Sequence, residues 1–449
     1  MQDSARVAAM KGTWRAFALA CCLAGSVRSA PLQVLAIGDS MTEEYAYELP
    51  FSAPDSDPTN ANVRNWPELL RIFRPEDATL GPYETGVAYA DLRDGGHEWN
   101  FGIPGFTTTN WVNLINTDNQ FDYPSGEPFG PLYYVTRQSL KGELPYAQAV
   151  VILLGANDLK QAYNDIFNNT EGPTYFNALV IRLTLIHNWV RSFTKVPIVI
   201  CTVPDVGATP DVSSTYSDPV RIANARAKIA AMNQSIVAMA ASKGATVARL
   251  DLVTDRVFDE HPLQVNGTVF TIGGAPENPP DHAFCKDGFH PATMAQALIA
   301  NEIMGALNTA TGRTIPPFTN REILKNLLGL NPDQPYLSWA ASHGGATDPA
   351  ADPDGDGVPN LAEYLLGSSP AAGGSPFTGS YTPGGILGWH PDPVAARYGD
   401  LIAEESADLQ GWTPVPAGRL TQGEAGQVQV TPAVSQPAGF VRLRAAVKP

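Results

Sequence analysis

A serine and a histidine stand where they could act together as a nucleophile and its base. Ser40 follows the apolar run 32–37 in the stretch GDSMT, where a glycine-assisted turn would expose its hydroxyl. Asp287 and His290 stand in the stretch DGFHP, and their three-residue spacing lets both side chains reach one site. A serine activated by a histidine that a carboxylate orients is an arrangement for attack on a carbonyl carbon. Taken singly, these residues are also ordinary turn and cap residues.

Two further motifs could stabilise the negative charge that such an attack creates. Gly105 lies in the stretch NFGIPGFT (100–107), with Gly102 as the alternative assignment. Asn157 lies in the stretch GAND, where an ordinary turn is the competing interpretation. Backbone N–H groups and side-chain amides at such positions can donate hydrogen bonds to an oxyanion.

The motifs follow predicted strands of a parallel sheet. Apolar runs suited to strands buried on both faces occupy 32–37, 99–103, 149–154, 196–201 and 246–252. Helical periodicity covers 175–193, 218–243 and 292–307. This alternation predicts an α/β fold, a three-layer α/β/α sandwich with a five-stranded parallel sheet, over residues 31–311. Sites in such sheets form outside the carboxyl ends of the strands, so the four motifs can converge.

Taken together and in this order, the four motifs resemble the blocks of the SGNH hydrolases, also called GDSL esterases and lipases. The resemblance covers about residues 32–307 and implies a flavodoxin-like SGNH fold. It implies a serine esterase with Ser40 as nucleophile, His290 as base and Asp287 as the residue that orients the histidine. The oxyanion hole would consist of the N–H groups of Ser40 and Gly105 and the amide of Asn157. The resemblance implies an ester substrate and no cofactor for catalysis.

The other histidines lack such neighbours. His187 falls in a predicted helix and is expected to be a packing residue, whereas loops are expected for His97, His261, His282, His343 and His390. Long loops at 107–146, 205–219 and 258–286 are expected to frame the site and to shape a substrate pocket.

An acidic loop near residue 355 matches the D-x-D-x-D-G-x5-E pattern of calcium sites. Its expected ligands are Asp352, Asp354, Asp356, the Val358 carbonyl, Asn360 through water, and Glu363. The loop resembles those of dockerin and thrombospondin type-3 repeats, which implies structural Ca²⁺. The alternative is an acidic, solvated turn.

The N-terminus has the pattern of a signal peptide, residues 1–30. Lys11 and Arg15 precede the apolar run 16–27, which small residues follow. The run is too short for a transmembrane helix, so a secreted, soluble protein is expected, whether periplasmic, cell-surface or extracellular. Export permits a disulfide between Cys201 and Cys285, with two buried thiols as the alternative.

Beyond the hydrolase domain we expect a linker (312–335), an EF-hand-like calcium-binding module (336–370) and a small β module (371–449), a β-sandwich. The last of these could contact a polysaccharide or a surface. The net charge of −16 disfavours binding to nucleic acid.

The expected reaction is hydrolysis of a carboxylic ester through an acyl-enzyme. Export and an accessory module suit a polymer, which favours O-acetyl groups on carbohydrate. The alternatives are a lipase or lysophospholipase, which would prefer long acyl chains, and a non-catalytic carbohydrate- or surface-binding protein on a hydrolase scaffold. The complete set of motifs argues against the last.

Overall fold

The computed structural model describes residues 30–46, 63–84, 89–123, 130–345, 347–379, 387–423, 426–431 and 439–449. The expected signal peptide therefore lies outside the described residues, except for Ala30. Within the part of the chain that is described, no helix is both long enough and apolar enough to cross a membrane.

A parallel sheet of six strands forms the centre of the N-terminal part, in the order β2-β1-β6-β7-β8 with β5 also paired to β1. All its pairings are parallel. The strands are β1 (Leu32–Gly38), β2 (Ala78–Thr79), β5 (Asn100–Gly102), β6 (Ala149–Leu153), β7 (Ile198–Cys201) and β8 (Thr246–Ala248). Strands occupy all five predicted runs, and β2 is an unpredicted sixth at the edge.

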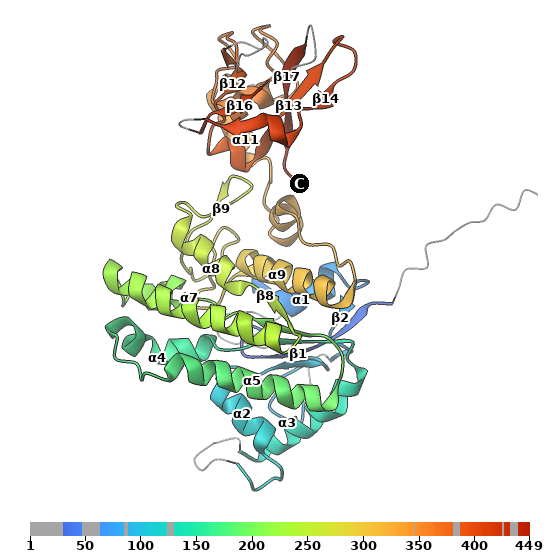
Figure 1. Cartoon of the computed structure of the whole chain (residues 1–449), viewed down its shortest axis with the longest axis vertical. Helices are drawn as coiled ribbons and strands as arrows, with labels where there is room; N and C mark the ends of the chain where they lie inside the picture. Colours follow the sequence, from blue (N-terminus) through green and yellow to red (C-terminus); the bar gives the residue numbers. More distant parts are fainter. Residues whose placement is uncertain are drawn as a thin grey trace, which may run out of the picture. The chain divides into compact units, whose positions relative to one another are not determined.

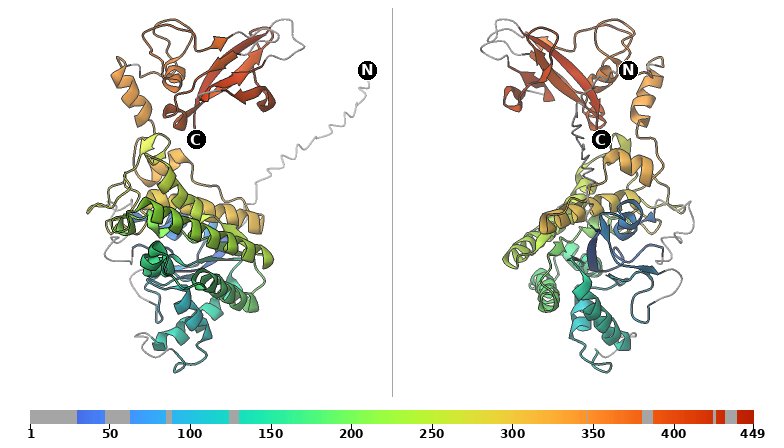
Figure 2. Two further views of the ribbon diagram at one scale, coloured as in Figure 1. Left: turned by 60° about the vertical axis from the view of Figure 1, so that its left-hand side comes forward. Right: turned by 90° about the vertical axis from the view of Figure 1, so that its right-hand side faces the viewer.

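Helices cover both faces of this sheet. Figures 1 and 2 show α1 and α9 on one side and α2, α4 and α5 on the other. The helices are α1 (Trp66–Phe73), α2 (Thr108–Asn116), α3 (Gly130–Glu143), α4 (Ala156–Asn168), α5 (Tyr175–Phe193), α7 (Pro219–Ser242), α8 (Leu250–Asp259) and α9 (Thr293–Thr311). A parallel sheet flanked by helices on both faces is the expected α/β architecture.

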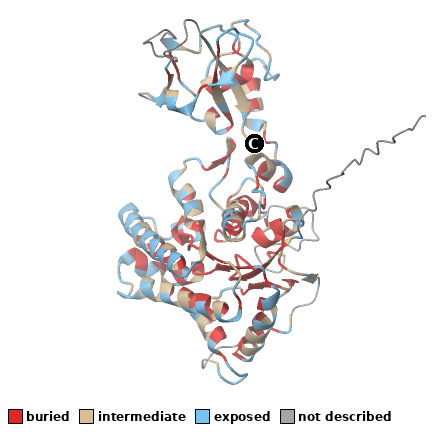
Figure 3. Cartoon of the chain, turned by 45° about the vertical axis from the view of Figure 1, so that its right-hand side comes forward, coloured by how far each residue is buried: buried red, intermediate tan, exposed pale blue. Residues whose placement is uncertain are grey.

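Burial on both faces explains the composition of the strands. Every residue of β6 is buried, and so are six of the seven in β1. Figure 3 shows the buried residues concentrated in the sheet and on the helix faces turned toward it. Trp66 of α1 and Trp111 of α2 are completely buried. Strands enclosed in this way need apolar side chains on both faces, and hence read as continuous apolar runs.

Among the segments that differ from their sequence-based predictions are the following three. The stretch 107–146, expected to be a loop, contains α2 and α3, because Thr107 caps α2 and Trp111 with Leu114 supplies a buried helical face. The predicted strand 246–252 ends at Ala248, and α8 begins two residues later. The expected linker 312–335 packs against the hydrolase core through Ile315, Phe318, Ile323, Leu324 and Leu327.

The C-terminal part contains two antiparallel sheets. One has the order β11-β12-β16-β15 and the other β14-β13-β17. The strands are β11 (Thr378–Gly379), β12 (Leu387–Trp389), β13 (Gly399–Ser406), β14 (Thr413–Pro414), β15 (Leu420–Gln422), β16 (Val428–Val430) and β17 (Phe440–Val447). Two helices, α11 (Gln334–Ser342) and α12 (Asn360–Leu366), flank the acidic loop.

Candidate active site

Ser40 sits in a tight turn directly after β1. The N–H groups of Thr42 and Glu43 both donate to the carbonyl of Asp39, at 2.9 and 3.0 Å. The carboxylate of Asp39 accepts the N–H of Met41 at 3.0 Å. These bonds hold the turn at the carboxyl end of the central strand, where sites form in open parallel sheets.

The structure brings Ser40, His290 and Asp287 together, although 250 residues separate the serine from the histidine. Ser40 Oγ lies 2.8 Å from His290 Nε2, and His290 Nδ1 lies 2.5 Å from Asp287 Oδ2. The second carboxylate oxygen of Asp287 accepts the N–H groups of Phe289 and His290 at 3.0 and 3.1 Å. The carboxylate is thereby fixed against the imidazole from two directions.

The hydrogen bonds to Asp287 favour its charged form. Burial by itself would raise the pKa of this carboxyl group. The hydrogen bond and charge of His290, together with the two backbone N–H groups, outweigh that effect and hold the pKa below its ordinary value. Asp287 is therefore an anion at neutral pH, suited to stabilise a positive imidazolium.

The imidazole of His290 is also held by its neighbours. The ring of Tyr45 meets it edge-on, with the ring centres 6.1 Å apart. The Tyr45 hydroxyl donates to the carbonyl of Pro291 at 3.1 Å and accepts a hydrogen bond from Gln296 at 2.7 Å. Contacts of this kind restrict the imidazole to few orientations, as a proton-transfer group requires.

The two alternative glycines have different environments. The N–H of Gly102 donates to the side chain of Asn100 at 3.0 Å, so it is not available to a substrate. Gly105 is exposed and has a φ of +73°, a left-handed conformation that favours glycine. Of the two, Gly105 has the geometry of an accessible donor.

Asn157 lies in the first turn of α4, directly beyond β6. Its Nδ2 donates to the carbonyl of Phe106 at 3.1 Å, which ties the amide to the loop that contains Gly105. One hydrogen of the amide group engages that carbonyl, and the second remains available for another acceptor. The described geometry therefore gathers the serine, glycine and asparagine motifs at neighbouring strand ends.

Asp158 joins the helices around this edge of the sheet. Its carboxylate accepts the N–H and the hydroxyl of Thr108 at 2.8 and 2.6 Å, and Arg182 lies 3.2 Å away. Burial, followed by the charge of Asp158, raises the pKa of nearby Asp39 to about 7, although the N–H of Met41 opposes this. Asp39 is thus a group that changes its charge near neutral pH.

Sequence reasoning missed a buried polar network beside the serine turn. His97, expected in a loop, ends the short strand β4 (Gly96–His97) and is only 3% exposed. It contacts Glu44, which is completely buried. Charged residues are seldom fully buried, so the residue type alone predicts that Glu44 lies at the surface. Its position four residues after Ser40 was the only available signal.

Three of the six expected calcium ligands lie close together. One carboxylate oxygen from each of Asp352, Asp354 and Asp356 lies within 4.8 Å of the others. Glu363 and Asn360 are both 1% exposed, and each has a buried oxygen without a hydrogen-bond partner among the described residues. Burial, then the charges of the three aspartates, raises the pKa of Glu363 to about 7. A hard cation with oxygen ligands would relieve both the repulsion and the missing partners.

Cys201 and Cys285 are both buried, free thiols. Of the two alternatives left open for this pair, the structure therefore has the reduced one. Burial raises the pKa of each thiol well above its ordinary value, so neither has the character of a reactive thiolate.

A parallel α/β sheet with a serine, a histidine and an aspartate hydrogen-bonded at its carboxyl edge has the architecture of a serine hydrolase. A sequence model of the GDSL-like lipase/acylhydrolase family matches residues 34–303, more than half of the chain. The chain belongs to this family and is a carboxylic ester hydrolase. None of the curated proteins matches it in sequence.

Among solved structures, an acetylxylan esterase from Geobacillus stearothermophilus is similar to this chain at 13% identity. The match covers 62% of this chain and 95% of that one, with a TM-score of 0.35. An α/β hydrolase enzyme from the metagenome of Lake Arreo, Spain, is similar at 15% identity. That match covers 63% of this chain and 96% of the other, with a TM-score of 0.33.

Proposed function

We propose that the chain is a secreted serine esterase that works through an acyl-enzyme, with Ser40, His290 and Asp287 as catalytic residues. The observation that carries the proposal is the 2.8 Å separation between Ser40 Oγ and His290 Nε2. A hydroxyl so close to an imidazole nitrogen can lose its proton as it attacks. Secretion rests on the signal-peptide pattern of residues 1–30.

In the first half-reaction, Ser40 Oγ bonds to the ester carbonyl carbon while its proton moves to His290 Nε2. The carbonyl oxygen becomes an oxyanion, and Asp287 stabilises the imidazolium. The intermediate collapses by breaking the bond to the alcohol oxygen, which leaves with the proton from His290. Water then gives its proton to the same imidazole as it attacks the acyl carbon. The bond between that carbon and Ser40 Oγ breaks, Oγ takes the proton back from His290, and the acid leaves.

The oxyanion would be stabilised by the N–H groups of Ser40 and Gly105 and by the amide of Asn157. Donors aimed at the developing charge are among the largest contributions to enzymatic rate. Support comes from the contact of Asn157 with Phe106 O, which holds the amide beside the Gly105 loop without using its second hydrogen.

The preferred substrate is an O-acetyl group on carbohydrate. In support, a cavity of about 560 Å³ lies along α4, and its lining includes Thr107 and Asp158, which lie within two residues of Gly105 and Asn157 in the sequence. Its lining includes the hydroxyl, amide and charged side chains of Thr109, Asn110, Gln161, Asp165, Tyr175 and Arg182. Such groups hydrogen-bond to sugar hydroxyls, whereas a long acyl chain gains free energy mainly by burial against apolar walls. A lipase or lysophospholipase is therefore the second candidate.

Hydrolysis of p-nitrophenyl acetate and of a long-chain p-nitrophenyl ester, by the purified protein and by its Ser40→Ala variant, tests the proposal. We expect activity on the acetate, little on the long chain, and loss of both in the variant. Faster hydrolysis of the long-chain ester would favour the lipase alternative. An unchanged rate in the variant would remove Ser40 from the mechanism. Glycan binding without turnover would support the non-catalytic alternative.

We also propose a structural calcium ion in the acidic loop. Asp352, Asp354, Asp356, the Val358 carbonyl and Glu363 would bind it directly, with Asn360 acting through water. The buried oxygen of Glu363 and the closely spaced aspartates support this assignment. Calorimetry should detect one calcium site in the intact protein and none in Asp354→Ala; absence of heat with the intact protein would rule the site out.

Contact of the β module with polysaccharide remains a proposal that a pull-down with insoluble glycans tests.

A further inference from the structure

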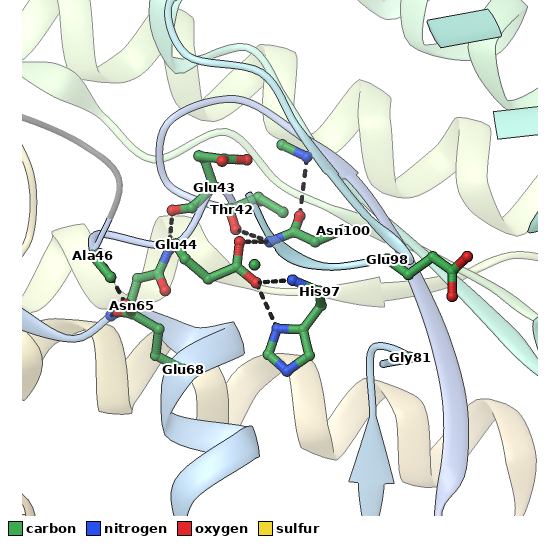
Figure 4. A network of polar contacts seen from close by, with 12 residues as sticks. Thr42, Glu43, Glu44, Ala46, Asn65, Glu68, Gly81, His97, Glu98 and Asn100 are labelled. Atoms are coloured by element: carbon green, nitrogen blue, oxygen red, sulfur yellow. Dashed lines mark hydrogen bonds and ion pairs between the residues drawn. The ribbon is translucent and has the colours of Figure 1, made fainter. Parts of the chain in front are cut away.

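The carboxylate of Glu44 lies at the centre of the buried network in Figure 4. Its Oε1 accepts the backbone N–H of His97 at 3.0 Å and lies 2.5 Å from His97 Nδ1. Its Oε2 accepts Nδ2 of Asn100 at 2.8 Å. The carboxylate is tightly packed against the backbone of Gly96, since a Cβ added to this glycine would lie 2.5 Å from it.

Asn100 connects the carboxylate to two different loops. Its Nδ2 also donates to the carbonyl of Thr42, two residues after the serine, at 2.6 Å. Its Oδ1 accepts the N–H of Gly102 at 3.0 Å. The same amide group therefore holds the Ser40 turn on one side and, on the other, the strand β5 that leads to Gly105.

The two loops touch backbone to backbone at this point. A Cβ added to Gly102 would lie 2.2 Å from the backbone nitrogen of Glu43. The N–H of Ile103 donates to the carbonyl of Gly38 at 3.2 Å. Small shifts in the network will therefore move the loop of Gly105 relative to the turn of Ser40.

We propose that Glu44 is a positioning residue that sets the separation between the two backbone oxyanion donors, the N–H groups of Ser40 and Gly105. The inference rests on the proposed function, because it concerns the oxyanion hole of that reaction. Glu44 acts through Asn100 and His97 and does not touch the substrate. Displacing one donor by about 1 Å can cost on the order of a hundredfold in rate, because oxyanion stabilisation depends on donor placement.

The carboxylate cannot be replaced by an amide without conflict. The backbone N–H of His97 and the Asn100 Nδ2 are donors at its two oxygens. In Glu44→Gln, the new NH₂ group must face one of these donors, whichever way the amide is turned. The change preserves shape and volume but forces the two loops to separate locally.

The test compares Glu44→Gln with Glu322→Gln, a matched control. Glu322 accepts two hydrogen bonds from Arg74, at 2.8 Å each, and is not part of the network around Glu44. We expect both variants to lose thermal stability. Only Glu44→Gln should lose kcat on p-nitrophenyl acetate, about tenfold to a hundredfold, with KM within about threefold of the parent value. A folded Glu44→Gln with kcat within twofold of the parent, or with a change confined to KM, would overturn the proposal.

A second pair keeps the proposal testable if Glu44→Gln does not fold. His97→Asn retains a donor near the position of Nδ1, whereas His97→Leu removes it. We expect kcat to be largely kept in the first and lost in the second; equal kcat values would contradict the proposal. If the parent protein is active, Ser40→Ala is inactive and Glu44→Gln keeps the parent kcat, only this inference is refuted. No loss in Ser40→Ala refutes the proposed function itself.

Discussion

Replacing Asn157 with alanine separates the rate effect of an oxyanion donor from its effect on stability. The amide makes one hydrogen bond, from Nδ2 to Phe106 O at 3.1 Å, and the side chain is partly exposed. Water can replace that bond, so we expect a loss of at most about 1 kcal/mol in the free energy of unfolding. The second amide hydrogen would be used only when negative charge develops on the substrate.

The expected rate loss is much larger. Removal of one oxyanion donor costs about 3–4 kcal/mol of barrier, which corresponds to roughly a 10²- to 10³-fold fall in kcat. KM should change by no more than a few-fold, because the donor contributes little to ground-state binding. The Asn157→Asp variant should be at least as impaired, because its carboxylate would face the carbonyl of Phe106 without a proton to donate.

Steady-state kinetics on p-nitrophenyl acetate and urea unfolding of the same samples provide both quantities. Asn164→Ala is the matched control, since Asn164 is exposed on the same helix, about two turns beyond Asn157, and does not line the cavity along α4. Its kcat should equal that of the parent protein. If Asn157→Ala kept its kcat within fivefold of the parent value while folded, Asn157 would not be an oxyanion donor.

Three further outcomes follow from the same geometry. Asp287→Asn should lower kcat about 10³- to 10⁴-fold, since an amide no longer stabilises the imidazolium or selects its tautomer; a loss below tenfold would contradict this role. Asp39→Asn should change the pH dependence of stability. Because burial raises the native pKa of Asp39 to about 7, the protein is most stabilised by this group below its unfolded pKa and loses that stability as pH rises through 7. Between pH 5 and pH 8, the free energy of unfolding of the parent protein should therefore fall by about 3 kcal/mol relative to that of Asp39→Asn, as measured by urea unfolding. If the difference between the two free energies did not change with pH, the pKa of Asp39 would not be raised. Gln161→Ala should raise KM about threefold to tenfold on an acetylated oligosaccharide and leave p-nitrophenyl acetate unaffected, since under the proposed carbohydrate specificity only the sugar would reach the cavity along α4; equal effects on both substrates would place the alcohol elsewhere.

Local sequence determined much of the hydrolase part of the chain. The apolar runs that became β1, β6 and β7 are readable because strands buried on both faces need apolar side chains at every position. The helix α5 has the predicted limits, 175–193, because its periodicity is unbroken between turn residues. The order of the four motifs, three of which directly follow β1, β5 and β6, was also sufficient to predict the family to which the chain belongs.

Tertiary structure decided what depends on contacts between distant residues. The sequence favoured Gly105 over Gly102, but only the fold gives the physical reason: the Gly102 N–H is used by Asn100, whereas Gly105 is exposed. Only the fold buries Glu44 against His97, since 53 residues separate them and both types are usually found at the surface. The same holds for 315–328, where proline and polar residues indicated a linker but the apolar side chains between them pack into the core. Periodicity and turn chemistry are local, whereas burial and hydrogen-bond partners are set by which segments the fold brings together.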